Sequence, residues 1–567
     1  MPRCFVFAFG GTGSRVLEKL TFLMASGSAY DDQSGYPNVE MPLGDWDIVP
    51  IIIDLDQHNG NMNSCTELLE EYHHIHHAIQ DVKQDKLQHK FFRYKLKKLK
   101  DINSATKSQD FNMNIQNVGK HTLSDSIGFQ YLSIEEDLFG TDQLVNLLYG
   151  QDELNMPLNK GFKGNPNIGT VIFGQLKNNP DFRTFLNTVS SEDRIFIIGS
   201  IFGGTGASGL PWLLKTLRNP VNINKNKTQI LQEIKIGALI VTPYFRLQPD
   251  KASEIDSDSF ITKTKAGLKY YEHNVQEANA MYFIGDRLEE GDLYPNEEGG
   301  KEQKNPPHPS ELFGALSFFH FMTKTNAELP ARETKHFRYG VKVDAQQKKI
   351  YFRHFENNTP SSRWLKLPLT MLYLSSIVFK KVMPTLHAPE PYIKIKIIEK
   401  KGNIFSGTKV DESFKETEFY KKLSSFFGRF LTLLQDLEER EKSNHHLFTP
   451  FMTNPQTGTK GIDRGDATPV NDLILQNPIG QSKTKGRFNG TKYKVGETDI
   501  VQVNVERVPI KYVHLIDALM LPVYNINHDF EGDNFKQIRL IELLYRGVYG
   551  FLLKHKHEFV MTEIDET

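Results

Sequence analysis

Two glycine-rich segments of this chain carry the residue types that bind phosphate. They are Gly10-Gly11-Thr12-Gly13-Ser14 and Gly203-Gly204-Thr205-Gly206-Ala207-Ser208, and each stands between an apolar run and a stretch with helical periodicity. Glycine lets the backbone approach a ligand closely, and the free N–H groups at the start of a helix attract anions. Serine and threonine hydroxyls can add hydrogen bonds. We therefore expect a phosphate site built from loops, with tight turns that hold no ligand as the alternative.

Neither segment matches a single-loop nucleotide motif. No Gly-Lys-Ser/Thr follows the glycines, which excludes a P-loop. A dinucleotide fingerprint that begins at Gly11 would need a third glycine where the chain has Val16. Asp54 and Asp56 nevertheless follow an apolar run, where an acidic residue suits a ribose contact. A dinucleotide-dependent oxidoreductase therefore stays open as an alternative.

The elements that must position these loops are short apolar runs separated by helical stretches. Continuous apolar runs of this length are typical of strands that are buried on both faces. The predicted strands are Arg3–Phe9, Ile48–Leu55, Arg194–Ser200, Ile234–Val241 and Ala280–Ile284. Because helices separate them, the pattern predicts an α/β fold with a mainly parallel sheet.

Taken in chain order, these segments resemble the tubulin/FtsZ superfamily. The best match is the run from Asp193 to Leu214, with its strand, its glycine loop and the later Pro211. Gly164-Asn165-Pro166 with Gly169 resembles the loop that covers the γ-phosphate in FtsZ, and Gly10 to Val16 resembles the first phosphate loop. Ile53 to Asp56, Lys235 to Pro243 and Ala280 to Asp286 resemble the remaining segments, so the resemblance covers roughly residues 1–325.

The resemblance implies a Rossmann-type parallel sheet that binds GTP or GDP with Mg²⁺. Asp54 and Asp56 would lie near the phosphates and the metal ion. The nucleotide-binding residues carried over are Gly10, Gly11, Thr12, Gly13, Ser14, Arg15, Asp54, Asp56, Gly164, Asn165, Gly203, Gly204, Thr205, Gly206, Ala207, Ser208, Pro243 and Asp286. It also implies head-to-tail self-association into filaments, with slow or assembly-dependent hydrolysis. A nucleotide-sensing module that acts on partner proteins without polymerising is the alternative.

The chain departs from the family where the base and the attacking water are bound. Arg15 and Gly285 stand where the family has asparagine, and the expected central helix Glu311–Thr323 lacks an obvious acidic residue for the base. Base selectivity should therefore be weaker than in tubulin or FtsZ. No Asn-x-Asp-x-x-Asp loop follows that helix. Asp344 and Glu328 are the nearest catalytic candidates in chain order.

A second, smaller α+β domain is expected over residues 326–567. A strong amphipathic helix is predicted over Phe414–Lys442 and a closing helix over Phe535–Lys554, with strand-like alternation in Ile393–Glu399 and Val501–Leu515. Two polar stretches, 286–310 and 453–499, are predicted to be loop insertions and could contact partner proteins.

Composition narrows the class of protein. Of 567 residues, 39% are hydrophobic and 24% charged, which is typical of a soluble globular protein. The net charge of −1 argues against nucleic acid as the main partner, and 2 cysteines exclude a disulfide scaffold. No apolar stretch has the roughly 20 residues of a membrane span. We expect a cytoplasmic protein.

Two further clusters favour ordinary structural roles. His73 and His77 are one helical turn apart and could hold a metal with Glu70, but a solvated or partner-facing helix is the favoured interpretation. The lysine-rich segment Asp81–Asp101 contains Phe91, Phe92 and Tyr94, whose spacing favours a packed face over nucleic-acid binding.

Overall fold

The computed structural model describes most of the chain, and two compact units are recognised in it. The described residues are 1–29, 39–40, 43–80, 87, 89–115, 121–132, 140–220, 225–250, 253, 258–275, 277–286, 293–297, 299–330, 333–338, 362–382, 399–400, 409–410, 412–442, 450–454, 456, 460–462, 491–495, 499–503 and 535–554. Unit 1 comprises residues 1–20, 45–70 and 95–340, and unit 2 comprises 21–44, 71–94 and 341–567. Unit 2 therefore also takes in two N-terminal segments, which a single boundary at residue 325 would have assigned to the first domain.

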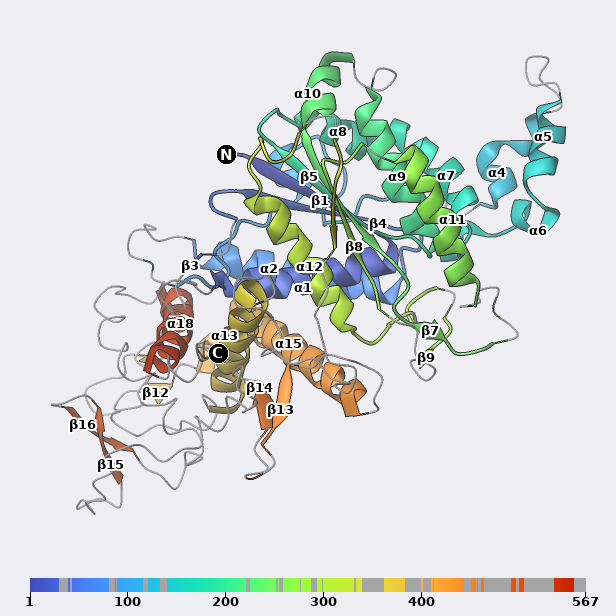
Figure 1. Ribbon diagram of the computed structural model, residues 1–567. Helices are drawn as coiled ribbons and strands as arrows, with labels where there is room; N and C mark the ends of the chain where they lie inside the picture. Colours follow the sequence, from blue (N-terminus) through green and yellow to red (C-terminus); the bar gives the residue numbers. More distant parts are fainter. Residues whose placement is uncertain are drawn as a thin grey trace, which may run out of the picture. The chain divides into compact units, whose positions relative to one another are not determined.

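Unit 1 is an α/β unit around a six-stranded parallel sheet (Figure 1). The strands are β1 (Arg3–Phe9), β4 (Asp47–Ile53), β5 (Arg194–Ser200), β6 (Lys235–Val241), β8 (Ala280–Ile284) and β10 (Lys335–Arg338). Their spatial order is β4-β1-β5-β6-β8-β10. The five strands predicted from apolar runs are confirmed. The sequence did not indicate β10, a short edge strand with Lys335 and Arg338 at its ends.

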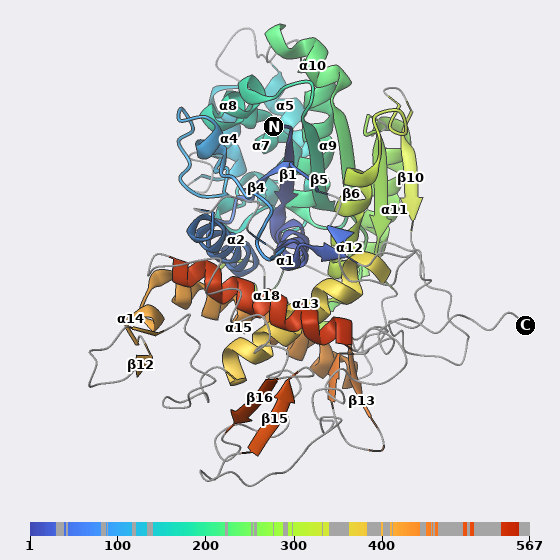
Figure 2. The same cartoon turned by 90° about the vertical axis from the view of Figure 1, so that its left-hand side faces the viewer.

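Helices cover both faces of this sheet (Figure 2). The longer helices in which unit 1 takes part are α1 (Gly10–Ser26), α2 (Gly60–Ala78), α7 (Pro166–Gly174), α8 (Pro180–Thr188), α9 (Gly204–Arg218), α11 (Asp258–Asn274) and α12 (Pro309–Thr323). Shorter ones are α3 (Leu99–Ile102), α4 (Leu123–Ile127), α5 (Thr141–Leu148), α6 (Gln151–Leu154) and α10 (Thr228–Glu233). The first residues of α1 and α2 belong to unit 1 and their last residues to unit 2.

Successive side chains of β1 and β5 point to opposite faces of the sheet and pack against the helices on each face. Phe5 and Phe7 both meet Phe185 of α8 edge-on, with ring centroids 5.0 Å apart. On the opposite face, Phe196 of β5 meets Phe318 of α12 at 5.4 Å. These aromatic side chains are fully buried, and such burial is the main favourable contribution to folding. The sheet is therefore rigidly placed between its helices.

Strand register decides which loops become neighbours. Phe9 pairs with Ile53, and Ala8 pairs with Ile198, so the chain leaves β1, β4 and β5 at one edge of the sheet. Chain order reverses at β1, because β4 lies on one side of it and β5 on the other. In open parallel sheets a crevice for ligands forms where the order reverses, outside the carboxyl ends of the strands.

In unit 2 the described residues build a helical core. Its helices are α13 (Leu367–Ile377), α14 (Glu412–Lys415), α15 (Glu418–Lys442) and α18 (Lys536–Lys554), and α13 packs against α15 and α18 (Figure 2). Every residue of α13 is buried, which explains its mostly apolar sequence, and the polar residues among them are Thr370, Ser375 and Ser376. Phe22 of α1 also packs on Phe426 of α15, with ring centroids 5.3 Å apart.

Short antiparallel strand pairs are also found among the described residues of unit 2. They are β2–β3 (Ser28–Ala29, Val39–Glu40), β11–β12 (Glu399–Lys400, Lys409–Val410), β13–β14 (Phe451–Thr453, Lys460–Ile462) and β15–β16 (Thr491–Val495, Asp499–Val503). The segment 453–499, predicted to be a loop, thus contributes strands to two pairs. The predicted strand 501–515 is observed only at its start, in β16, and 504–515 lies outside the described residues. The same holds for 393–398 of the strand predicted over 393–399.

Two other sequence expectations meet the structure here. Phe91, Phe92 and Tyr94 are buried, so the packed interpretation of the lysine-rich segment is confirmed. Among the helices that the structure describes, none combines the length and the apolar character needed to cross a membrane.

Candidate functional site

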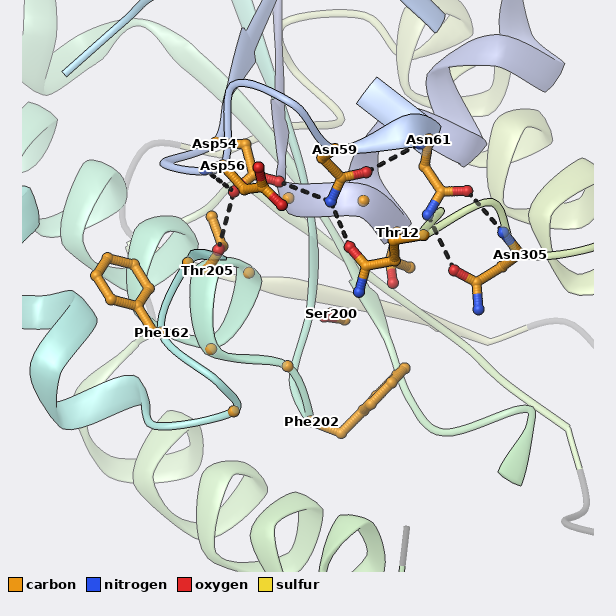
Figure 3. Close-up of a pocket in the computed structure, with 18 of the residues that line it drawn as sticks. Thr12, Asp54, Asp56, Asn59, Asn61, Phe162, Ser200, Phe202, Thr205 and Asn305 are labelled. Carbon is orange, nitrogen blue, oxygen red and sulfur yellow. Dashed lines mark hydrogen bonds between the residues drawn. The ribbon is translucent and has the colours of Figure 1, made fainter. Parts of the chain in front are cut away.

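The two glycine loops predicted to bind phosphate are in contact. Gly10 follows β1 with a left-handed φ of +70°, and a Cβ added there would lie 3.1 Å from Cβ of Thr205 in the second loop. The loops are close because β1 and β5 are neighbouring strands that end at the same level. Both loops line one pocket at this edge of the sheet (Figure 3).

The third loop, residues 161–165, packs on the second. A Cβ at Gly204 would lie 2.8 Å from Cβ of Phe162 and 3.3 Å from the backbone nitrogen of Gly164. The loop turns sharply, with φ of +77° at both Gly161 and Gly164. The structure therefore brings together the three loops that the sequence singled out, around one pocket that is partly open to solvent.

Most of the predicted nucleotide-binding residues line this pocket, and some do not. Those that line it are Gly10, Gly11, Thr12, Arg15, Asp54, Asp56, Gly164, Gly203, Gly204, Thr205 and Gly206. The remaining predicted residues, outside the lining, are Gly13, Ser14, Asn165, Ala207, Ser208, Pro243 and Asp286.

The two serines lie outside the lining because their hydroxyls turn inward. Ser14 Oγ donates to the Gly10 carbonyl at 3.0 Å, and Ser208 Oγ donates to the Gly204 carbonyl at 2.6 Å. Each hydroxyl thus bonds within the first turn of its own helix, as serine often does in helices. The expectation that these hydroxyls face a phosphate is not met. Thr12 and Thr205 remain on the pocket wall.

Asp54 and Asp56 form a buried acidic pair beside the phosphate loops. They are 6% and 3% exposed. Asp54 accepts from the backbone N–H of Asp56 at 3.3 Å and from the hydroxyl of Thr205 at 3.4 Å. Asp56 accepts from the backbone N–H groups of His58 and Gly300. All these donors are uncharged.

The environment of Asp54 favours its protonated form when no cation is bound. Burial, and after it the charge of Asp56, raise the pKa of Asp54 to about 7. Mg²⁺ prefers oxygen ligands, keeps several waters and binds through one or two carboxylates together with phosphates. The pair therefore fits a divalent cation that a phosphate group also contacts.

Arg15 belongs to a second buried charged cluster, which borders the pocket. Its Nε lies 3.3 Å from Oε1 of Glu311, and Lys19 Nζ lies 3.3 Å from Oε2 of the same carboxylate. Tyr244 donates to Glu311 at 2.9 Å and accepts from Arg15. Glu311 is 1% exposed in the first turn of α12, the helix predicted to lack an obvious acidic residue for the base.

A further wall of the pocket comes from a segment that was predicted to be a loop insertion. Within 286–310, the lining residues are Pro295, Glu297, Gln303 and Asn305. Asn59 Nδ2 donates to Gln303 Oε1 at 2.5 Å, and Asn61 Nδ2 donates to Asn305 Oδ1 at 2.9 Å (Figure 3). These amide pairs close one side of the pocket, and no sequence pattern linked residues 244 positions apart.

Aromatic side chains line another part of the pocket. They are Phe202, Phe245 and Phe260, and the ring centroids of Phe202 and Phe260 are 5.0 Å apart. Phe245 stacks on Tyr294 with centroids 4.5 Å apart. This contact adjoins the parallel pair β7 (Arg246–Leu247) and β9 (Leu293–Tyr294). A planar apolar ligand group could stack on such a surface.

Glu328, one of the two catalytic candidates, is not among the residues that line this pocket. Asp344 lies outside the described residues. Glu328 accepts from Thr325 N–H at 2.8 Å and from Lys324 Nζ at 3.2 Å in an exposed turn. Arg194, the first residue of β5, donates to the Lys324 carbonyl at 2.7 Å. Glu328 therefore lies at the amino edge of the sheet, opposite the edge that carries the phosphate loops.

The histidine pair on α2 brings two ring nitrogens together. His73 Nε2 and His77 Nε2 are 3.1 Å apart, whereas Glu70 pairs with Lys98 at 2.7 Å. Within the described part of the chain, no three His, Cys, Asp or Glu side chains are grouped as a metal site. Asp286, one of the predicted nucleotide-binding residues, has its Oδ2 3.7 Å from Nε2 of the buried His308.

Comparisons with known proteins add no assignment. No protein-family model matches the chain, and no curated protein matches its sequence. The geometry of the site is therefore the basis for the functional proposal.

Proposed function

We propose that this chain is a tubulin/FtsZ-like nucleotide-binding protein that holds GTP or GDP together with Mg²⁺. The observation that carries the proposal is the meeting of three glycine-rich loops and a buried acidic pair in one pocket. This pocket lies at the carboxyl edge of a parallel sheet, where the strand order reverses. Loops that begin helices offer free N–H groups to phosphates.

Each part of the ligand has a matching part of the pocket. Phosphates would lie against the loop at Gly10–Thr12 and the loop at Gly203–Gly206, in which no side chain is larger than that of threonine. Asp54 and Asp56 would hold Mg²⁺ beside them. The base would stack on the aromatic wall that includes Phe202 and Phe245. Mg²⁺ would neutralise two carboxylates that otherwise repel a polyphosphate.

We also propose head-to-tail self-association, with hydrolysis that is slow unless the chains assemble. Glu328 and the pocket lie at opposite edges of one sheet. A head-to-tail contact would bring the Glu328 edge of one chain to the pocket of the next, and repeated contacts of this kind give filaments. Carboxylates that orient the attacking water would then come from a neighbouring chain. The polar segments could serve partner proteins.

Isothermal titration with GTP, GDP, ATP and NAD⁺, each with Mg²⁺, tests the nucleotide site. Gly11→Val should abolish binding, because its side chain would enter the pocket. A Cβ at Gly11 first meets the amide ends of Asn61 and Asn59, at 3.2 and 3.5 Å, so the fold should tolerate the change. Gly174→Val is the matched control, since a Cβ there meets no atom within 4 Å.

The outcomes separate the competing classes. Binding of guanine nucleotides that Gly11→Val removes and Gly174→Val retains would support the proposal. Tight binding of NAD⁺ alone would indicate an oxidoreductase instead. Nucleotide binding without any change in sedimentation across concentrations would indicate the non-polymerising module.

A further inference from the structure

The outer side of α2 carries a histidine pair that the proposed function does not use. The inner side of the same stretch packs through Tyr72, Ile75 and Ile79, which are at most 2% exposed. His73 and His77 lie on the other side, where His73 is half-buried and His77 is exposed. Residues four positions apart on a helix are neighbours on one face. The pair can therefore be reached from solvent.

The two imidazole rings are turned toward each other. Their Nε2 atoms are 3.1 Å apart, and the ring centroids are 4.3 Å apart with an angle of 62° between the planes. A neutral imidazole has one nitrogen that donates and one that accepts. One Nε2 therefore carries the proton and the other accepts it. The two nitrogens converge on the same small space beside the helix.

The distance between these nitrogens is the one that a shared metal ion requires. Imidazole nitrogens bind Zn²⁺ at about 2.0–2.1 Å, so two of them at an N–Zn–N angle of about 90–110° are about 2.8–3.4 Å apart. The observed 3.1 Å lies within this range. Histidines at the same spacing on one helix face bind zinc in the His-Glu-x-x-His metalloproteases. Here His74 takes the place of that glutamate, so the likeness is confined to the two ligands.

The type and number of ligands define the class of ion. Imidazole suits Zn²⁺, Cu²⁺ and Ni²⁺, whereas Mg²⁺ prefers oxygen. Glu70, which the sequence suggested as a third ligand, is 2.7 Å from the ammonium of Lys98. The protein thus supplies two nitrogen ligands, and water would fill the other positions of a four-coordinate ion.

We infer that His73 and His77 form a binding site for a divalent transition metal ion of the zinc class. The site is independent of the proposed nucleotide pocket, because it uses nitrogen ligands on α2 and not the carboxylates of Asp54 and Asp56. The ion takes the place of the shared proton, and each ring then holds its own proton on Nδ1. Bound across one turn of α2, the ion stabilises the folded helix.

The test is calorimetric titration of the full chain with ZnCl₂, after removal of metals with EDTA and in the presence of excess Mg²⁺. Mg²⁺ occupies oxygen sites that Zn²⁺ would otherwise also enter. We expect His73→Gln and His77→Gln each to weaken the tightest Zn²⁺ binding by about 10- to 100-fold or more, since even the loss of a residue that only supports a metal ligand costs that much.

His74→Gln is the matched control. His74 is the adjacent histidine on the same helix, and its Nδ1 lies 3.7 Å from Glu418 rather than in the pair. This variant should bind Zn²⁺ as the wild type does. A loss in His74→Gln equal to that in the other two variants would show that the ion does not select the pair, and would overturn the inference.

Two further measurements separate a metal ligand from a residue that only supports the helix. Zn²⁺ should raise the midpoint of thermal unfolding of the wild type and of His74→Gln, because the ion binds the folded chain, and should leave the other two variants unchanged. Electron paramagnetic resonance of bound Cu²⁺ should show coupling to two imidazole nitrogens in the wild type and to fewer in His73→Gln and His77→Gln. Equal spectra in all variants would contradict the assignment.

Failure of this inference can be told apart from failure of the proposed function. If the wild type bound no Zn²⁺, or if His73→Gln and His77→Gln bound it as tightly as the wild type, the pair would be a hydrogen-bonded pair only. That result would overturn the inference and leave the nucleotide site as it stands. Zn²⁺ binding that depends on the pair, in a chain that binds no nucleotide, would overturn the proposed function alone.

Discussion

Two buried charged clusters border the same pocket and differ in their balance of charge. The first holds Arg15 and Lys19 against Glu311, and the second holds Asp54 beside Asp56. All five residues are at most 6% exposed. In the first, burial lowers the pKa of Arg15, but Tyr244 and Glu311 raise it by more. The pKa of Arg15 is therefore raised. In the second, burial and the like charge of Asp56 both raise the pKa of Asp54.

The difference shows how a cluster that serves the fold can be told from one that awaits a ligand. Opposite charges within hydrogen-bonding reach compensate each other, and breaking such a pair leaves an expensive uncompensated charge. Like charges that only uncharged donors contact repel each other without compensation. The first cluster therefore ties α1 to α12, and the second is the part of the pocket to which we assign Mg²⁺ in the proposed function.

Breaking the compensated cluster should have the largest effect on stability. Glu311→Gln leaves Arg15 and Lys19 buried without that carboxylate, and we expect the free energy of unfolding to fall by about 3–5 kcal/mol. Urea denaturation followed by circular dichroism measures this. Asp152→Asn, on α6, is the control, because that side chain is solvent-exposed. A loss below about 1 kcal/mol would mean that the cluster contributes little to the fold.

The acidic pair should give the protein without ligand an unusual pH dependence. The pKa of Asp54 is about 7 in the folded chain, above its ordinary value of 3.8. The folded state therefore binds more protons than the unfolded state between pH 4 and pH 7. The stabilisation that comes from protonated Asp54 is present at pH 4 and is lost as the pH rises to about 7. The free energy of unfolding falls by no more than about 1.4 kcal/mol per pH unit from this group.

This pH dependence is measured as a difference between two proteins, because other groups also titrate. The free energy of unfolding of wild type minus that of Asp54→Asn should fall with rising pH over this window. Mg²⁺ should flatten the decline, since it favours the ionised carboxylate. A difference that rises with pH would show that Asp54 is stabilised as a carboxylate without any cation.

Removing one charge from the pair should weaken ligand binding without harming the fold. We expect Asp56→Asn to lower Mg²⁺-dependent nucleotide affinity about tenfold or more and to leave the midpoint of urea unfolding unchanged or higher. Titration with Mg²⁺ and with EDTA gives the metal-dependent part. Asp152→Asn, an exposed change on α6, is the control. Equal affinities with and without Mg²⁺ in the wild type would remove the metal from the proposal.

Glu328 should have the smallest effect on binding. The backbone N–H of Thr325, its hydroxyl and Lys324 lower the pKa of Glu328 to about 2, so it stays ionised at neutral pH. Glu328→Gln should leave nucleotide affinity unchanged and reduce only the phosphate release that rises with protein concentration. A fast rate per chain that dilution does not change would show a complete catalytic site within one chain.

The architecture of unit 1 could be predicted because its main signals are local. Apolar runs such as Phe5 to Phe9 bury both faces of a strand wherever they lie in the sheet, and the glycines that follow them define turns. Edge strand β10 escaped prediction because it is short and carries charged ends. Likewise, the polar sequence of 453–499 predicted a loop, because two-stranded pairs bury too little surface to require an apolar pattern.

The sequence by itself determined five of the six strands of the parallel sheet and the glycine loops, because each follows from the chemistry of a few consecutive residues. Only the tertiary structure decided which polar side chains meet. Glu311 became the partner of Arg15, and Asn305 that of Asn61, across separations that no periodicity spans. The physical reason is that a buried polar group must find a partner wherever the fold places one.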